Sequence, residues 1–301
     1  MADLATTLGP TKLRSAVMTA SGTAGRRDEL AAYGDLAKLG AVVVKSLSAE
    51  PWPGNPAPRV ASVGVAMVNS VGLQGPGVAS WLEQDLPALQ ARGATVVASI
   101  WGRRVADFAE AAALLRGAPI AAIEVNVSCP NLESRNEIFA HSPSATEEVL
   151  SACDVGIPRW AKLSPNTDAI VDVAEAAVRG GASAVTLTNT LVAMAIDVEE
   201  RRPVLGAKRG GMSGAGLHPV ALRAVFDVHE ALPDLAINGV GGVRSGEEAV
   251  AFLMAGASAV QVGTATFEDP RSVWRVQREL AAWMDRHGVR GIEEIRGAAH
   301  G

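Results

Sequence analysis

The stretch LAINGVGGVRSGEEAVAFLMAGASAVQVGT, residues 235–264, decides the fold because it shows a unit that recurs along the chain. Two short apolar runs, at 235–239 and 258–262, have the length of buried strands. The segment 245–255 between them has the apolar spacing of a helix. A strand, a helix and a second strand in this order predict a crossover between parallel strands.

The same alternation continues through the rest of the sequence. Further strands are expected at 16–20, 41–45, 95–100, 121–126, 159–163 and 183–188. Further helices are expected at 104–116, 144–154, 168–179, 218–230 and 270–287. Capping pairs are expected at two helix starts: Ser144 with Glu147, and Ser245 with Glu248. About eight repeats of this unit predict an α/β fold, a (β/α)8 or TIM barrel, rather than a sandwich or a bundle.

Two long stretches interrupt the alternation, residues 46–78 and 190–217. The first is rich in proline and glycine around an alternating segment, 60–68, that we expect to form an extra hairpin. Long loops inside a compact domain are usually lids or binding loops, so we expect both insertions at the C-terminal face of the strands. No linker or repeat divides the chain, and we expect residues 1–301 to form a single domain.

Composition narrows the class of protein. Hydrophobic residues make up 48% and charged residues 20% of the chain, and the net charge is -5. No run of basic residues resembles a nucleic-acid footprint, so no nucleic-acid partner is expected. The apolar runs are far shorter than the roughly 20 residues of a membrane span, and the first residues lack the pattern of a signal peptide.

The cysteines and histidines suggest no metal site. The two cysteines, Cys129 and Cys153, form no C-x-x-C pair, which fits a reducing, cytoplasmic location and excludes an iron–sulfur cluster held by this chain alone. The five histidines lack metal-ligand spacing and are interpreted as surface or capping residues. No bound metal is therefore expected.

Polar residues recur where the expected strands end. Lys45, Asn126, Lys162 and Asn189 each close an apolar run, where a buried polar group costs stability unless it is paired or used. A single such lysine would as readily be a snorkelling side chain, but the recurrence favours a shared ligand site. The remaining strand ends carry Ser21, Ser99, Gly241 and Gly263.

Glycines follow the last two strands. Gly241 and Gly242 precede a helix, and Gly263 and Thr264 follow the final strand. Glycine allows phosphate to approach bare backbone N–H groups, and these two strand ends form a recurrent phosphate cradle in such barrels. A Rossmann fingerprint is incomplete, since Arg244 replaces its third glycine.

Cys129 lies in the polar loop EVNVSCPN, residues 124–131, just beyond the fourth strand. A thiol there is a candidate nucleophile or base, or a small core residue. Cys153 lies within a helical pattern and is interpreted as core filler.

These motifs together resemble the dihydroorotate dehydrogenase family. The resemblance is collinear from about residue 8 to 295 and rests on the following segments: ASG (20–22), VVVKSLS (42–48), GNPAPRV (54–60), NSVGLQGPG (69–77), EVNVSCPN (124–131), KLSPN (162–166), TNTL (188–191), GGMSG (210–214), GVGGV (239–243) and GASAVQVGTA (256–265). A cysteine in the catalytic loop resembles class 1, and GLQGPG, together with the lack of an N-terminal membrane-associating extension, resembles class 1B.

The resemblance implies an activity and partners. It implies an FMN flavoprotein, an oxidoreductase that converts (S)-dihydroorotate to orotate in de novo pyrimidine (UMP) biosynthesis. A base would remove the C5 proton while a hydride passes from C6 to FMN. It also implies a homodimer and an NAD-linked electron-transfer subunit that carries FAD and an iron–sulfur cluster.

The resemblance also assigns residues. Cys129 would be the base. The FMN contacts would be Ala20, Ser21, Lys45, Ser46, Ser99, Asn126, Lys162, Gly214, Gly241, Gly242, Gly263 and Thr264. The substrate contacts would be Lys45, Asn69, Ser70, Val71, Gly72, Leu73, Asn126, Asn189 and Thr190.

The chain departs from the family pattern in a few places. Ser99 stands where the family usually has asparagine, and Trp101 beside it is expected to shape the floor of the site. The usual small residues become Leu191-Val192-Ala193, and SGPA becomes SGAG at 213–216.

Other classes remain open from the residues alone. A flavin barrel acting on a related pyrimidine, of the dihydropyrimidine dehydrogenase or dihydrouridine synthase type, is the nearest alternative. A catalytically inactive binding subunit and a phosphate-binding aldolase or isomerase barrel are the others; the latter would be colourless.

Overall fold

Eight parallel strands form the centre of the molecule. The structure is a computed structural model that describes residues 2–128, 130–131 and 137–301. The eight strands are β3 (Val17–Thr19), β4 (Val42–Val43), β7 (Val96–Ile100), β8 (Ala122–Asn126), β11 (Arg159–Lys162), β12 (Ala184–Leu187), β17 (Ile237–Val240) and β18 (Ala259–Val262). They pair in the order β3-β18-β17-β12-β11-β8-β7-β4. The backbone N–H of Gly40 donates to the carbonyl of Val17 at 2.9 Å, which brings the two end strands β3 and β4 together. The expected (β/α)8 barrel is confirmed.

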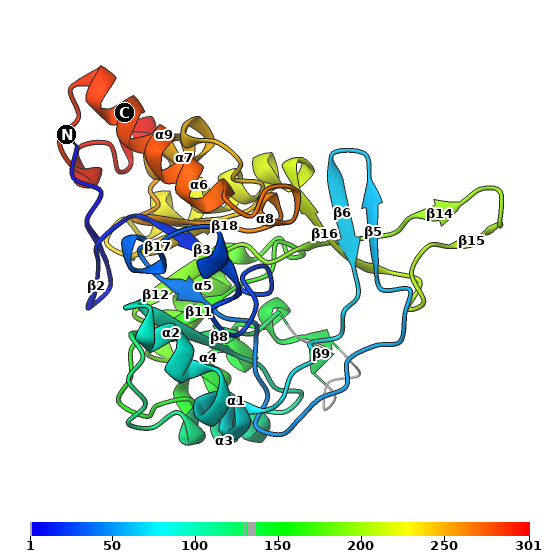
Figure 1. The fold of residues 1–301 in the computed structure, drawn as a ribbon. Coiled ribbons are helices and arrows are strands. Elements are labelled where there is room, and N and C mark those ends of the chain that lie inside the picture. Colours follow the sequence, from blue (N-terminus) through cyan, green and yellow to red (C-terminus); the bar gives the residue numbers. More distant parts are fainter. Residues whose placement is uncertain (1, 129, 132–136) are drawn as a thin grey trace.

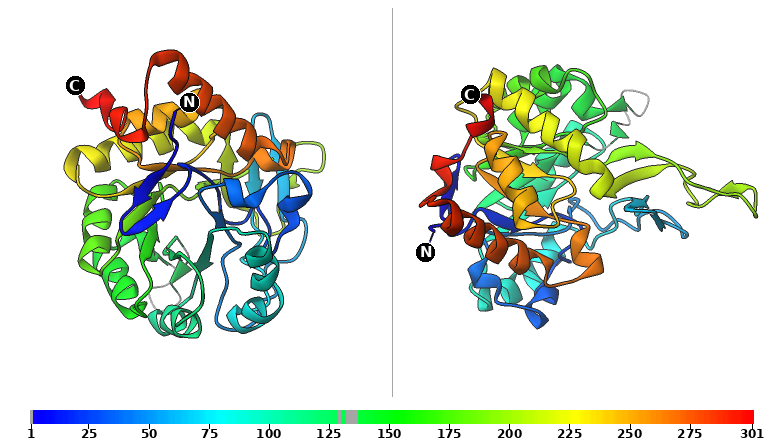
Figure 2. Two further views of the ribbon diagram at one scale, coloured as in Figure 1. Left: turned by 60° about the vertical axis from the view of Figure 1, so that its left-hand side comes forward. Right: turned by 90° about the horizontal axis from the view of Figure 1, so that it is seen from above.

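Helices surround the strands (Figure 2, left). They are α1 (Val78–Gln84), α2 (Leu86–Ala91), α3 (Val105–Leu114), α4 (Pro143–Ala152), α5 (Ile170–Arg179), α6 (His218–Ala231), α7 (Gly246–Met254), α8 (Ala265–Glu268) and α9 (Ser272–His287). Two short 3-10 turns, Glu29–Ala32 and Leu36–Lys38, stand between β3 and β4 in place of a helix. None of the helices in the described residues is long and apolar enough to cross a membrane.

One expected helix start is wrong by two residues. Ser142, not Ser144, caps α4: its hydroxyl accepts the backbone N–H of Ala145. Ser142 has the extended backbone that an N-cap needs, and proline follows at the first helical position. Glu147 instead pairs with Arg179 of α5 at 2.9 Å. The capping box expected at α7 is confirmed.

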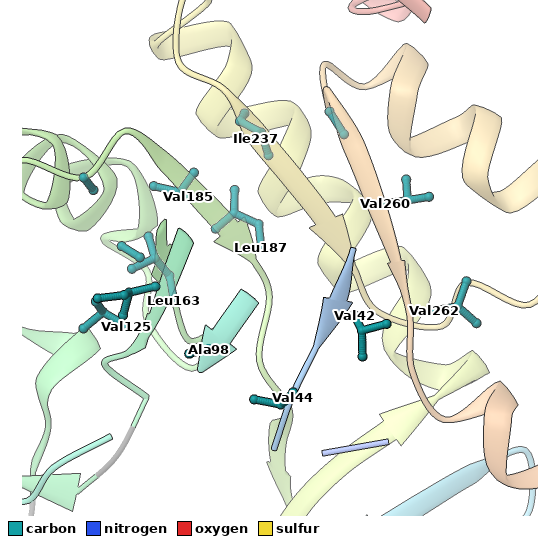
Figure 3. Close-up of a cluster of buried hydrophobic side chains, with 14 of the residues drawn as sticks. Val42, Val44, Ala98, Val125, Leu163, Val185, Leu187, Ile237, Val260 and Val262 are labelled. Atoms are coloured by element: carbon teal, nitrogen blue, oxygen red, sulfur yellow. The ribbon is translucent and has the colours of Figure 1, made fainter. Parts of the chain in front are cut away.

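Side chains of the barrel strands alternate between two apolar clusters. One set, with Val125, Val185 and Val260, points outward and packs under the helices (Figure 3). The alternate set, with Val43 and Trp160, fills the barrel interior. Leu8 and Leu13 join the interior set from the hairpin β1 (Thr6–Leu8) and β2 (Thr11–Leu13), which therefore closes the bottom of the barrel.

The two insertions form a second sheet, the insertion sheet. The hairpin expected at 60–68 is present as β5 (Val60–Val63) and β6 (Ala66–Asn69). The other insertion contributes β13 (Leu191–Ala193) and β16 (Gly210–Gly214), and the four strands pair in the order β13-β16-β6-β5. The tip of the second insertion, where β14 (Ile196–Asp197) pairs with β15 (Arg202–Pro203), projects to one side, away from both termini (Figure 1). A further small pair, β9 (Pro130–Asn131) with β10 (Glu137–Ile138), follows β8.

Candidate active site

A cavity of about 640 Å³ lies where the carboxyl ends of the barrel strands meet the insertion sheet. This is the face at which such barrels carry their chemistry. The charged side chains among its lining residues are Lys45 and Lys162. The lining residues are Ala20, Ser21, Gly22, Thr23, Lys45, Ser46, Asn55, Val60, Met67, Asn69, Ser70, Val71, Gly72, Leu73, Asn126, Ser128, Lys162, Thr188, Asn189, Thr190, Gly210, Gly211, Ser213, Gly214, Leu217, Val240, Gly241, Gly242, Gly263, Thr264 and Phe267.

Lys162 ends β11 and presents its ammonium group to this cavity. Its side chain is only 6% exposed, and its Nζ donates to the Ser21 hydroxyl at 3.0 Å. The Glu124 carboxylate of β8 lies 3.5 Å from the same Nζ and is fully buried. The ammonium is therefore held by one hydroxyl and one carboxylate at the floor of the cavity.

A chain of side-chain hydrogen bonds orients the asparagines beside it. Asn189 Nδ2 donates to Asn126 Oδ1 at 3.1 Å, and Asn126 Nδ2 donates to the Ser46 hydroxyl at 3.4 Å. The backbone N–H of Ser128 also donates to Asn126 Oδ1. Asn126 therefore keeps its oxygen toward Asn189 and its nitrogen toward Ser46. Two amides fixed in this way offer a ligand donors and acceptors at set positions.

The glycine cradle, formed by Gly241, Gly242, Gly263 and Thr264, lies at the carboxyl ends of the neighbouring strands β17 and β18. Gly241 and Gly242 have φ of 145° and 71°, conformations that glycine adopts without penalty. In the described part of the chain, the backbone N–H groups of Gly241, Gly242, Gly263 and Thr264 donate to no other residue. The Thr264 hydroxyl donates to Ser213 of β16 at 2.8 Å, which ties the cradle to the insertion sheet. Four unused N–H groups at the ends of β17 and β18 fit a phosphate group.

The first insertion supplies the opposite wall. Asn55 holds its loop: its Nδ2 donates to the carbonyl of Ser70 at 2.9 Å, and its backbone N–H donates to that of Val71. Asn69 Nδ2 donates to the Gly211 carbonyl of β16. The hydroxyl oxygen of Thr188, at the end of β12, is buried and has no hydrogen-bond partner among the described residues. Thr188 lines the cavity, so a bound ligand can supply that missing partner.

A family profile for dihydroorotate dehydrogenase matches residues 3–284. The chain belongs to this family. It is 44% identical to the "dihydroorotate dehydrogenase B (NAD(+)), catalytic subunit" of Alkaliphilus metalliredigens over 289 residues, 95% of each chain. The protein of the same name from a Geobacter species is 42% identical over 98% of both chains. The one from Desulforudis audaxviator is 44% identical over 96% of this chain and 94% of its own. The resemblance to the B type of dihydroorotate dehydrogenase is thereby confirmed.

The structure brings together nearly all residues assigned by the resemblance to this dehydrogenase family. Every expected FMN or substrate contact lines the cavity except Ser99. Ser99 is fully buried behind the lining residue Ser46, and the two hydroxyl oxygens lie 2.9 Å apart. The expected base, Cys129, lies outside the described residues. Its neighbours Asn126 and Ser128 line the cavity.

Trp101 does not shape the floor as expected. It is buried and does not line the cavity, and its ring lies edge-on to that of Trp52 with ring centroids 5.7 Å apart.

Cys153 is fully buried, and this burial raises the pKa of its thiol to about 12, which confirms it as a core residue. No group of residues suited to a metal ion occurs in the described ranges.

The histidines are not all surface residues. His300 stacks on Phe226 with ring centroids 3.8 Å apart and contacts His229 edge-on. Burial, followed by the charges of Arg296 and His300, lowers the pKa of His229.

Sequence reasoning missed two buried residues that support the floor, Glu124 and Gln261. Gln261 Nε2 donates to Glu124 Oε2 at 3.0 Å. The available signal was an acidic residue inside an otherwise apolar strand, AAIEVN at 121–126. The roles of Thr188 and Ser213 were missed as well, although both lie within motifs shared with the family.

Proposed function

We propose that this chain is the catalytic subunit of a dihydroorotate dehydrogenase, which oxidises (S)-dihydroorotate to orotate in de novo pyrimidine synthesis and uses FMN. The observation that carries this proposal is one cavity that joins a cradle of unused N–H groups to oriented amides and two lysines. A phosphorylated flavin and a small amide-containing acid require such a combination. The family match and the names of the relatives favour this substrate over the dihydropyrimidine dehydrogenase-like alternative.

FMN fits the cradle better than a dinucleotide. The N–H groups of Gly241, Gly242, Gly263 and Thr264 would hold one terminal phosphate, and Lys162 would lie near the electron-rich ring. A methyl group on Gly242 would come within 2.8 Å of His218 and 2.9 Å of the Gly214 carbonyl, so the cradle depends on glycine there. FMN, when bound, supplies the acceptor for the hydride from C6 of the substrate.

The chain's own residues would bind the substrate and take its proton. Asn69, Asn126 and Asn189 carry the donors and acceptors that match an amide and carboxylate edge. Lys45 would neutralise negative charge on the substrate carboxylate or the flavin. Cys129 would accept the C5 proton as a thiolate, a step that contributes about 10²–10⁴-fold to the rate when the base is well placed. The insertion sheet would exclude water from this step.

We further propose an NAD-linked electron-transfer partner that carries FAD and an iron–sulfur cluster, and a homodimer of this chain. The support is the term "catalytic subunit" in the relatives' names and the presence of only two cysteines, too few for a cluster. The low cysteine content also supports a cytoplasmic location.

The test begins with the purified chain. We expect it to be yellow and to release FMN on acid or heat treatment, identified by chromatography. Anaerobic addition of dihydroorotate should bleach the flavin band, whereas NAD⁺ reduction should be poor without the partner subunit. A colourless protein, or a flavin that dihydroorotate fails to bleach, would contradict the proposed function.

A further inference from the structure

Glu124 is a fully buried carboxylate inside the barrel, beneath the cavity. Its Oε1 lies 3.5 Å from Lys162 Nζ, and its Oε2 accepts a hydrogen bond from Gln261 Nε2 at 3.0 Å. Glu124 lies on β8, Lys162 on β11 and Gln261 on β18. Three strands therefore contribute to one buried ionic cluster.

This cluster lies above an apolar layer. Along β8, the side chain of Ala122 belongs to the interior apolar cluster, and Glu124 and Asn126 follow it on the same face of the strand. Trp160 and Lys162 show the same sequence of layers on β11. Glu124 thus separates the apolar bottom of the barrel from the cavity.

A buried ion pair is seldom worth its desolvation for stability alone, because apolar residues of equal volume are often as stable or more so. Its presence directly below a ligand cavity calls for another role. The Lys162 side chain is only 6% exposed, and the Glu124 carboxylate 3.5 Å from its Nζ is the counter-charge that compensates for the loss of water around the ammonium group. Lys45 is the other charged side chain that lines the cavity, and because its charge has the same sign it cannot stabilise the Lys162 ammonium group.

We propose that Glu124 is a positioning residue that holds the Lys162 ammonium group at the cavity floor and, through Lys162, sets how readily the bound flavin is reduced. The effect on flavin reduction rests on the proposed function, whereas the effect of Glu124 on Lys162 does not. A positive charge near the ring stabilises the electron-rich reduced flavin, so retention of that charge raises the midpoint potential.

Glu124→Gln tests the charge with little change of shape. The new amide oxygen can accept from Lys162, and its nitrogen can donate to Gln261 once that side chain rotates its own amide. The oxygen Gln261 Oε1 has no partner among the described residues and is available for this bond. All polar groups of the cluster can then remain paired, so we expect the variant to fold.

The first experiment needs no flavin. The chain has only five lysines, so their side-chain carbon signals can be separated by NMR after isotope labelling, and Lys162→Met identifies the one from Lys162. In the unmodified chain, relaxation of this signal should show an ordered side chain. In Glu124→Gln the Lys162 side chain should become more mobile, because its charged partner is gone. Equal order of this side chain in both proteins would overturn the role of Glu124.

The second experiment measures the midpoint potential of the bound flavin in a double-mutant cycle. Glu124→Gln should lower the potential when Lys162 is present, and should leave it unchanged or raise it in the Lys162→Met background. Equal shifts in both backgrounds, or no fall with Lys162 present, would overturn the proposal. Thr186→Val is the matched control: it removes the hydroxyl that Asn238 Nδ2 contacts in the same barrel interior, and should leave the potential unchanged.

Failure of the two proposals can be distinguished. Absence of a flavin from the unmodified chain would refute the proposed function, and the order of the Lys162 side chain would still decide whether Glu124 holds the ammonium group. A flavoprotein whose potential does not respond to Glu124→Gln would leave the dehydrogenase assignment intact and refute this inference.

Discussion

Gly263→Ala should weaken FMN binding without unfolding the chain. The added Cβ would lie 3.3 Å from the Cβ of Ala20, slightly closer than ordinary contact, and Gly263 has no left-handed backbone to strain. The two backbones cannot simply separate, because the N–H of Ala20 donates to the carbonyl of Val262 at 2.9 Å. The methyl group must therefore be accommodated at the cavity wall, between the cradle and Ala20.

The size of the effect follows from overpacking. An extra carbon in a tightly packed site costs about 1–3 kcal/mol. If this cost falls on the flavin-bound state, the Kd for FMN rises by about 5- to 150-fold, since 1.4 kcal/mol corresponds to about tenfold. The free energy of unfolding of the flavin-free chain should change by at most about 1 kcal/mol.

Titration of the flavin-free protein with FMN, followed by quenching of flavin fluorescence, measures this Kd. Gly291→Ala is the matched control, because a Cβ there meets nothing within 4 Å and the position is not part of the cavity lining. The reasoning is refuted if Gly263→Ala binds FMN as tightly as Gly291→Ala does, at equal stability.

Three further outcomes are expected. Cys129→Ala should remain folded and yellow, but flavin bleaching by dihydroorotate in a stopped-flow instrument should slow by about 10²-fold or more; Cys129→Ser should retain some activity and need higher pH. The pKa of Cys153 is raised by burial from 9.0 to about 12, so the stability it contributes is present below pH 9 and is lost as pH rises toward 12. Urea unfolding should show a fall of up to about 4 kcal/mol over this range that is absent in Cys153→Ala. Burial is the main cause that lowers the pKa of His229, so the stability that His229 contributes is present above pH 6.5 and is lost as pH falls. His229→Gln should therefore flatten the decline in melting temperature below pH 6.5. An unchanged decline would count against this role of His229.

The eight barrel strands were predictable from the sequence because their signal is local. Each is a short apolar run followed by a glycine or polar residue, and each forms a strand near the expected position. The cavity was predictable for the same reason, since parallel strands bring their carboxyl ends to one face. The helix start at Ser142 was missed because two serines, Ser142 and Ser144, compete at this position and only the backbone conformation decides between them.

Contacts between distant segments could not be predicted from local patterns. The bond from Asn69 to Gly211 spans 142 residues, and that from Gln261 to Glu124 spans 137. The role of Glu124 could not be recognised from its own strand, because its partners Lys162 and Gln261 come from two other strands. Trp101 was misjudged because its sequence position beside Ser99 does not show that its ring turns toward Trp52.

The insertion sheet makes two distant parts of the gene a single exchangeable unit. Met212 of β16 pairs with Val68 of β6, so the backbone bonds of each insertion are completed by the other. A chimera of two family members with its crossover between residues 70 and 190 would join the first insertion of one parent to the second insertion of the other. In such recombinants the paired strands β6 and β16 would come from different parents. Transplanting either insertion therefore requires transplanting both.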